Sequence, residues 1–306
     1  MTRSKTLVAG GTGFVGRFIV ERLLREGHDV AVFGRTAPPP GYFTGPVRFF
    51  SGMLDPAQDF SQALADADFL VHAAFDHVPG RYRGGEGEDP EGFRRRNLDG
   101  SLALFGAAKQ AGLRRAIFLS SRAAYGGEAT GAILTEDMPC HPGSLYGQVK
   151  RATEEALRAM ADPHFVPISL RVTGVYGPSG HGRLHKWSGL FADYLAGKPI
   201  EPRAGSEVHG DDVAAAVSLM LATPAQAVSG HMFNVSDMLV DRRDILAIVR
   251  KVTACAHPLP ERAEAAAIAI MATERLHAHG WRPGGWPLFA ETVEGLARQH
   301  QPAVLG

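Results

Sequence analysis

Short apolar runs alternate with longer stretches of helical periodicity along the first 172 residues of the chain. The runs, which we expect to be β-strands, lie at residues 5–9, 28–33, 47–50, 67–74, 114–121 and 165–172. Helical spacing separates most of them, most clearly at residues 14–23, 92–111 and 145–161. Strands that are apolar throughout and alternate with helices form parallel sheets covered on both faces. The pattern therefore predicts an α/β fold with a doubly wound parallel sheet of the Rossmann type.

The first strand is followed by the sequence GGTGFVG, in which Gly10, Gly13 and Gly16 recur every three residues where a helix begins. Glycines at such a junction let the main chain turn tightly and approach a ligand closely. The first turn of a helix also presents unpaired N–H groups and a positive dipole end, which favour an anion such as a dinucleotide pyrophosphate. The alternative interpretation is a turn that only permits close packing of the helix on the strand.

The pattern changes after residue 172, where glycine, proline, histidine and tryptophan interrupt shorter helical pieces. We therefore expect a dinucleotide-binding Rossmann domain over residues 1–172 and a smaller substrate-binding lobe over residues 173–306, interleaved with the first. Residues 37–46 and 76–92 are rich in turn formers and are expected to be long functional loops.

Candidate catalytic side chains follow at the carboxyl edge of the predicted sheet. Ser120 and Ser121 end the fifth strand, and Tyr146 and Lys150 lie four residues apart on the next helix, hence on one helical face. A tyrosine hydroxyl ionises near about pH 10, so a neighbouring ammonium would help to stabilise its phenolate near neutrality. Each feature alone is common, and a surface tyrosine packed on a lysine stem is the alternative. Their order along one chain favours catalysis.

Together these features resemble the extended short-chain dehydrogenase/reductase superfamily, in particular its NAD-dependent epimerase/dehydratase family. The resemblance runs through almost the whole length. The motifs that carry it are GGTGFVG at 10–16, LVHAA at 70–74, SSRAAYG at 120–126, YGQVK at 146–150, LRVTGVYGP at 170–178, VHGDDVAAAV at 208–217, FNVSD at 233–237 and GWRP at 280–283.

The resemblance implies that Tyr146 is the general acid or base, that Lys150 binds the nicotinamide ribose and tunes Tyr146, and that Ser121 holds the reacting oxygen. It implies a nicotinamide dinucleotide cofactor held by Gly10, Thr12, Gly13, Phe14, Val15, Gly16, Arg35, Leu54, Ala73, Ala74, Tyr146 and Lys150. Asn97 matches the family's asparagine in the preceding helix, with either a polar bridging role or a structural one.

The cofactor type is predicted from the end of the second strand. An NAD site usually has an acidic residue there for the ribose hydroxyls, whereas this chain has Gly34 followed by Arg35. A guanidinium can bind a 2′-phosphate through two hydrogen bonds. We therefore expect NADP in preference to NAD, the alternative being that Arg35 is a solvated loop residue.

Substrate binding is expected from the segment 179–187, in which Arg183, His185 and Lys186 could meet an anionic or polyhydroxylated substrate. A solvated loop is the alternative. Three positions depart from the family pattern. Gly174 replaces an asparagine near the substrate diphosphate, Gly205 and Ser206 stand where an arginine is common, and Met53 replaces an acid near the adenine. A nucleotide-sugar substrate is less certain for that reason.

Composition excludes several other classes of function. The chain has 32 basic and 32 acidic residues, which gives no basis for nucleic-acid binding or attachment to an anionic membrane. Cys140 and Cys255 lie far apart, and neither they nor the scattered histidines suggest a metal site or a disulfide. Residues 263–272 are too short to span a membrane and are expected to form a buried or half-buried helix. We expect a cytoplasmic homodimer without bound metal.

These observations favour an enzyme that oxidises a secondary alcohol or reduces a ketone, on a sugar or nucleotide sugar, as an epimerase, dehydratase or reductase. A reductase of a small non-sugar carbonyl compound is the alternative enzyme, favoured by Gly174 and the missing arginine. A cofactor-sensing regulator without turnover is a third hypothesis, and the retained Tyr146 and Lys150 argue against it.

Overall fold

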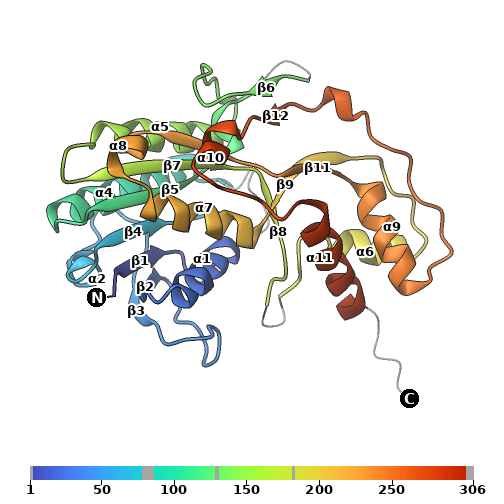
Figure 1. The fold of residues 1–306 in the computed structure, drawn as a ribbon, viewed down its shortest axis with the longest axis horizontal. Coiled ribbons are helices and arrows are strands. Elements are labelled where there is room, and N and C mark those ends of the chain that lie inside the picture. The colour runs from blue at the N-terminus through green and yellow to red at the C-terminus, as the bar shows by residue number, and fades with distance from the viewer. Residues whose placement is uncertain (1–2, 78–85, 128–130, 181–182, 301–306) are drawn as a thin grey trace.

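The computed structural model of the chain describes residues 3–77, 86–127, 131–180 and 183–300, and within them a seven-stranded parallel sheet forms the centre (Figure 1). The order across the sheet is β10-β7-β5-β4-β1-β2-β3. Its strands are β1 (Lys5–Ala9), β2 (Asp29–Gly34), β3 (Arg48–Ser51), β4 (Phe69–His72), β5 (Arg115–Ser121), β7 (Val166–Val172) and β10 (Met232–Val235). The predicted doubly wound α/β fold is confirmed, and the six strands expected from the sequence lie close to their predicted positions.

Helices cover both faces of this sheet, as continuous apolar strands require. Leu7 and Val8 show how neighbouring residues of β1 serve opposite faces, since Val8 joins the core beneath one layer of helices and Leu7 the core beneath the other. The first layer holds α1 (Phe14–Arg25), α7 (Gly210–Ala222) and α8 (Ala225–Val228). The second holds α2 (Ser61–Leu64), α4 (Gly100–Gln110) and α5 (Leu145–Ala159).

The helix expected over residues 92–111 is divided into three parts. It begins as α3 (Pro90–Arg94), continues as a π-helical turn η1 (Arg95–Asp99) and ends as α4. A π-helical turn inserted in a helix frequently marks a functional site. Asn97 lies within this turn and is almost fully buried.

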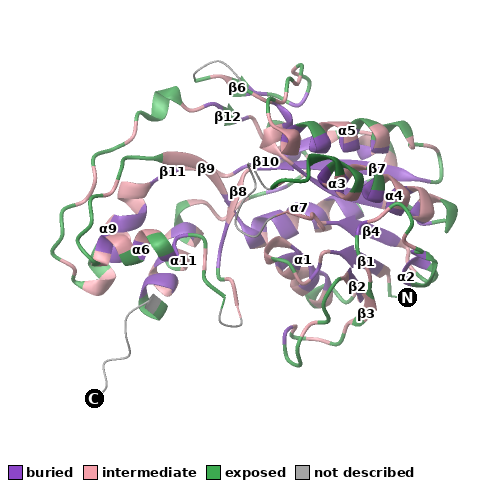
Figure 2. Cartoon of the chain, turned by 180° about the vertical axis from the view of Figure 1, so that it is seen from behind, coloured by how far each residue is buried: buried purple, intermediate pink, exposed green. Residues whose placement is uncertain are grey.

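A second lobe lies beside the carboxyl edge of the main sheet and has its own apolar core (Figure 2). It contains a three-stranded sheet in the order β11-β9-β8, in which β9 is parallel to β8 and antiparallel to β11. Its elements are β8 (Gly174–Tyr176), α6 (Ser188–Leu195), β9 (Ala204–His209), β11 (Met238–Asp241), α9 (Arg242–Thr253) and α11 (Gly285–His300). Tyr176, Trp187 and Phe289 pack their rings together in this core.

The chain crosses between the two parts more than once. After β9 it returns to the main sheet, where α7 packs on α1 and β10 pairs with β7. The sequence motif at residues 233–237 therefore includes a seventh strand of the main sheet, which the periodicity analysis did not predict. The division at residue 172 stays a prediction.

The alanine-rich segment 263–272 does not form the expected helix. It contains the 3₁₀ turn η3 (Ala265–Ala267) and the strand β12 (Ile270–Met271), which pairs with β6 (Ile133–Leu134). Ala265, Ala266 and Ala267 are exposed, because alanine methyl groups offer too little apolar area to hold a helix against a core. The remaining short elements are the 3₁₀ turn η2 (Arg122–Ala124) and α10 (Glu274–Ala278). Among the described residues no helix is both long and apolar enough to cross a bilayer.

Candidate active site

A cavity of about 1190 Å³ runs along the carboxyl edge of the main sheet. One end is formed by residues that follow β2 and β3, including Arg35 and Leu54. The other end is formed by the end of β5 and by Tyr146 and Lys150 of α5. Since β1 and β4 separate β2 from β5 in the sheet, the cavity is an elongated groove that passes over the turn after β1. This is where doubly wound folds bind their ligands.

The glycine turn is set by close contacts of the main chain. Gly10 has φ +81°, and a Cβ there would lie 2.6 Å from the backbone of Ala74. A Cβ at Gly16 would lie 2.1 Å from the carbonyl oxygen of Gly10. Gly10 and Gly16 are therefore needed for packing, so the packing interpretation accounts for two of the three glycines.

Gly13 points to a ligand as well as to packing. It is the N-cap residue of α1, and no side chain of the described residues caps this helix. The cavity is lined here by Thr12, Gly13, Phe14 and Val15, so the uncapped end of α1 opens into it. Unpaired N–H groups at a helix N-terminus suit a phosphate group, and the site therefore fits a dinucleotide pyrophosphate. Ala73 and Ala74, after β4, line the same part of the cavity.

Lys150 lies buried at the opposite end, with 4% of its surface exposed. Its Nζ donates to the carbonyl oxygen of Leu119 at 2.7 Å and lies 4.4 Å from the ring centroid of Phe75. Burial lowers the pKa of Lys150 to about 7, although the nearby Glu154 carboxylate opposes this shift. The same Nζ lies 5.9 Å from the ring centroid of Tyr146, which agrees with their expected placement on one helical face.

The two serines at the end of β5 have different surroundings. Ser120 is buried, and its hydroxyl donates to Glu154 Oε1 at 2.5 Å. Ser121 lines the cavity, and its Oγ accepts from the backbone N–H of Ala123 at 3.2 Å. Both line the cavity wall, but Ser121 is the one whose hydroxyl is not engaged by a buried carboxylate.

The partner of Ser120 belongs to a buried ion pair that sequence reasoning missed. Arg171 on β7 and Glu154 on α5 are fully buried, and Arg171 NH2 donates to Glu154 Oε2 at 2.8 Å. The pair joins α5 to β7, and the hydrogen bond from Ser120 adds β5, so these contacts hold α5 against the sheet. An arginine in the apolar run FVPISLRV was the available signal, because a charge in a buried strand requires a partner.

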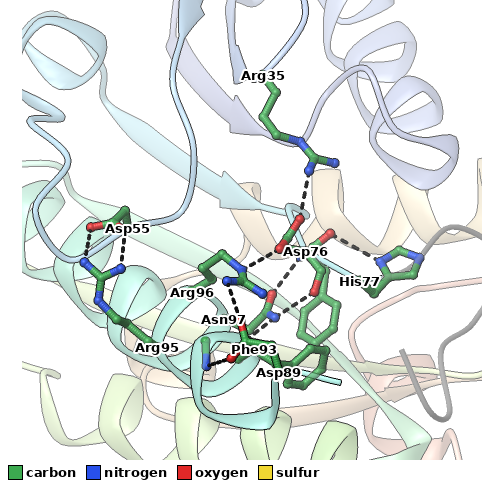
Figure 3. Close-up of polar contacts among 11 residues, drawn as sticks. Arg35, Asp55, Asp76, His77, Asp89, Phe93, Arg95, Arg96 and Asn97 are labelled. Carbon is green, nitrogen blue, oxygen red and sulfur yellow. Dashed lines mark hydrogen bonds and ion pairs between the residues drawn. The ribbon is translucent and has the colours of Figure 1, made fainter. Parts of the chain in front are cut away.

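Asn97 holds the chain that follows β4. Its Oδ1 accepts from the backbone N–H of Asp76, and its Nδ2 donates to the backbone oxygen of Asp76, both at 2.7 Å (Figure 3). Nδ2 also donates to the oxygen of Phe93 at 3.0 Å. All of these contacts are to the protein's own backbone and fit the structural interpretation of Asn97, while a bridging role in the active site stays a prediction.

Arg35 lines the cavity but is engaged by the protein itself. Its NH1 lies 2.8 Å from Asp76 Oδ1, and Arg96 Nε lies 2.7 Å from the other oxygen, Asp76 Oδ2 (Figure 3). Asp76 and Arg96 line the cavity too, and neither was singled out from the sequence. No local pattern could reveal them, because the contacts join segments that are distant along the chain.

The predicted substrate-binding residues Arg183, His185 and Lys186 all line the cavity. Arg183 NH1 donates to the carbonyl oxygen of Thr12 at 3.3 Å, so it lies near the glycine turn. His185 Nδ1 accepts from the N–H of Trp187 at 3.2 Å, and its ring packs on Phe191 in the second lobe. His181 and Gly182 of the same segment, and residues 78–85 of the loop 76–92, lie outside the described residues.

Lys186 forms an ion pair with Glu207 beside Gly174. A Cβ at Gly174 would lie 2.5 Å from Lys186 Nζ and 2.7 Å from Glu207 Oε2, so the ion pair fills the space of the missing side chain. Burial raises the pKa of Glu207, and Lys186 opposes that shift. The departure at Gly174 therefore lies near the one at Gly205 and Ser206, since Gly174 is paired in register with Glu207, the residue after Ser206.

Two carboxylates at the start of α7 have partners within the protein. Asp211 and Asp212 lie in the first turn of α7, and Asp212 accepts from the N–H of Gly284 at 3.1 Å. Burial raises the pKa of Asp212 to about 6. Across the described parts of the chain, no three histidine, cysteine, aspartate or glutamate side chains gather so as to hold a metal ion.

The fold and the groove define a Rossmann-type protein with a dinucleotide-shaped site at the sheet edge. The chain belongs to the NAD dependent epimerase/dehydratase family, whose family model matches residues 6–236. It is accordingly an NAD-dependent enzyme of the extended short-chain dehydrogenase/reductase type.

Individual relatives support the same assignment. The chain is 27% identical over 319 residues to UDP-glucose 4-epimerase of Streptomyces lividans, with 91% of each chain covered. It is 31% identical over 175 residues to human sterol-4-alpha-carboxylate 3-dehydrogenase, decarboxylating, which covers 56% of this chain and 44% of the human one. A solved structure of Thermus thermophilus UDP-glucose 4-epimerase with NAD has a TM-score of 0.76 and 28% identity, and the match covers 98% of this chain and 100% of that one.

Proposed function

We propose that this enzyme catalyses hydride transfer at a secondary alcohol or ketone carbon of a sugar or nucleotide sugar, with Tyr146 as the proton donor or acceptor. The observation that carries the proposal is one groove with the uncapped N-terminus of α1 in its wall and Tyr146 and Lys150 at one end. A nicotinamide dinucleotide supplies the hydride chemistry when it is bound. The protein supplies orientation and proton handling.

Tyr146 and Lys150 would have different roles in the transfer of the proton. The proton would be held or released at the Tyr146 hydroxyl, next to the substrate oxygen that Ser121 receives at the cavity wall. The Lys150 ammonium would stabilise the phenolate and hold the nicotinamide ribose, while Leu119 fixes its position. Because the pKa of Lys150 is about 7, its charge changes near neutral pH.

We further propose that the cofactor is bound by residues of the glycine turn, namely Gly10, Thr12, Gly13, Phe14, Val15 and Gly16, together with Arg35, Leu54, Ala73 and Ala74. Arg35 and the absence of an acid at the end of β2 favour NADP over NAD. The similar structures of the Thermus epimerase and of MoeE5 were solved with NAD, and a comparison of Kd for NADP and NAD tests which cofactor this chain prefers.

Two classes of substrate are proposed, a sugar nucleotide and a small carbonyl compound. A sugar nucleotide is favoured by the relatives, one of which, MoeE5, was solved with UDP-glucose and NAD at 25% identity. A small carbonyl compound is favoured by the Lys186–Glu207 pair, because it places a carboxylate where a diphosphate would need donors. The homodimer and the cytoplasmic location stay predictions.

Replacement of Tyr146 by phenylalanine tests the proposed chemistry. Purified enzyme would be incubated with NADP or NAD and a panel of UDP-sugars, free sugars and small ketones, with products followed by chromatography and cofactor redox state by absorbance. On any substrate that the parent converts, Tyr146→Phe should lower kcat by at least about 100-fold, the lower range for a general acid or base, with cofactor affinity retained.

The matched control is Tyr194→Phe. It removes a hydroxyl of the second lobe that donates to the backbone oxygen of His257, and neither residue lines the groove. Its kcat should stay near that of the parent. If Tyr146→Phe kept a near-parental rate on an authentic substrate, the assignment of Tyr146 would be wrong. Inversion of a sugar centre without net cofactor reduction would indicate an epimerase, and net cofactor turnover a dehydrogenase or reductase.

A further inference from the structure

One carboxylate in the groove is shared between two arginines from different elements. Asp76 Oδ1 lies 2.8 Å from Arg35 NH1, and Asp76 Oδ2 lies 2.7 Å from Arg96 Nε. Arg96 has a second carboxylate partner, Asp89, at 3.2 Å, whereas Arg35 forms its ion pair with Asp76 (Figure 3). The carboxylate thus takes the position that an anionic ligand of both guanidinium groups would take.

The Arg35–Asp76 pair crosses the groove. Arg35 follows β2 and Asp76 follows β4, and β1 lies between these two strands in the sheet. The pair therefore spans the region of the glycine turn, at the end of the groove that also contains Leu54. Residues at the end of β2 face the adenosine ribose in doubly wound dinucleotide sites.

The two members of the pair differ in how firmly they are held. The backbone of Asp76 is fixed on both sides by Asn97, and 27% of its side chain is exposed. The side chain of Arg35 is 66% exposed, and its guanidinium is held by the ion pair with Asp76. Arg35 can therefore turn toward a ligand, while Asp76 stays in place as a negative charge.

We propose that Asp76 determines the cofactor specificity of this site by competing with the 2′-phosphate of NADP for Arg35. The proposal rests on the proposed nicotinamide dinucleotide site. NADP must take Arg35 from Asp76 and then lie close to its carboxylate. NAD carries no 2′-phosphate and leaves the pair intact. Asp76 thus weakens a preference that Arg35 alone would create.

Asp76→Asn removes the charge and keeps the size of the side chain. Isothermal titration would give Kd for NADP and for NAD with the parent and the variant. The ratio Kd(NAD)/Kd(NADP) should rise about tenfold in Asp76→Asn, as expected for removal of one nearby charge in a partly screened site. Asp76→Ser should shift the ratio in the same direction, and thermal unfolding of both variants checks that they are folded.

Two further variants separate Arg35 from general electrostatics. Asp89→Asn removes the other carboxylate on Arg96 while keeping an oxygen that accepts from Gly92 to cap α3, and the ratio should not change. Between Arg35→Ala and Arg35→Ala/Asp76→Asn the rise should be much smaller than tenfold, because only the direct repulsion between Asp76 and the 2′-phosphate is then removed. A ratio unchanged in Asp76→Asn and Asp76→Ser, a comparable rise in Asp89→Asn, or an equally large rise without Arg35 would each overturn the proposal. A parent that binds neither nucleotide would instead overturn the proposed function itself.

Discussion

Lys150 combines a costly environment for a charge with a position at the wall of the groove. Its ammonium is almost fully buried between the rings of Phe75 and Phe118, and one carbonyl oxygen, that of Leu119, accepts from it. Burial of a charge disfavours the ionised form, which explains why its pKa falls from 10.5 to about 7. Groups perturbed in this way and placed in a cleft are candidates for catalysis.

Replacement of Lys150 by methionine should change how stability depends on pH. Between about pH 7 and pH 10.5 the unfolded parent binds a proton at Lys150 that the folded parent does not, so the parent becomes more stable as pH rises through this range. Lys150→Met lacks this gain. The difference in unfolding free energy, parent minus variant, should therefore rise with pH by up to about 1.4 kcal/mol per pH unit above pH 7.

Urea unfolding of both proteins at pH 6, 7, 8 and 9 measures this difference, and other titrating groups cancel in the comparison. A difference that stays flat from pH 7 to pH 9 would show that the pKa of Lys150 is not lowered in the folded chain, because both states would then keep the proton throughout this range.

Residue chemistry was predictable from the sequence where it depends on local spacing. Tyr146 and Lys150 share a helical face by their four-residue separation, and Gly10 and Gly16 follow from the turn that they form. Asp76, Arg96 and Glu207 escaped prediction because their importance depends on partners that only the folded chain brings close. Spacing alone could not distinguish Ser120 from Ser121, for which the family resemblance was needed, since the structural difference between them is the contact of Ser120 with the buried Glu154.

At the scale of elements, the junction of β1 and α1 determines the shape of the cofactor end. The close approach of Gly16 to the carbonyl of Gly10 brings the start of α1 against the end of β1. That approach directs the uncapped helix N-terminus into the groove. Sequence periodicity predicted this element pair well, because an apolar strand, a glycine turn and an amphipathic helix are all local patterns.

Gly16→Ala should disrupt this junction. A Cβ would lie 2.1 Å from Gly10 O, so the helix must move, which costs stability by about 1–3 kcal/mol, as for overpacking elsewhere. The movement should also weaken dinucleotide binding. Gly106→Ala in α4 is the matched control, because the added Cβ would meet no atom within 4 Å other than its chain neighbours and the backbone of its own helix. It should stabilise the chain by about 0.5–1 kcal/mol. Urea unfolding and nucleotide titration measure both effects, and parental stability in Gly16→Ala would contradict the packing argument.

Elements that depend on distant pairing were predicted less well. β10 joins the main sheet by pairing with β7, about 60 residues earlier in the chain, and its four residues are too short to show a period. The alanine-rich segment 263–272 was assigned to a helix on composition, but β12 pairs with β6 there instead. In both cases tertiary pairing outweighs local propensity.

At the scale of the whole molecule, the groove and the second lobe explain why one chain can hold both a cofactor and a substrate. The groove passes from Arg35 to Tyr146 along the sheet edge, and Lys186 reaches it from the segment that enters the second lobe. The Trp281 indole N–H donates to the backbone oxygen of Asp212, and the backbone N–H of Gly284 donates to the Asp212 carboxylate. These two contacts tie α7 to the chain that enters α11. The lobe is therefore fixed to the same helix layer that supports the glycine turn.

A crystal structure of the chain with NADP or NAD bound tests the central claim most directly. The account predicts the pyrophosphate at the N-terminus of α1 beside Gly13, the adenosine toward Arg35 and Leu54, and the nicotinamide ring beside Tyr146 and Lys150. A nucleotide bound in the reverse direction, with its adenine against Tyr146, or bound outside this groove would contradict the account.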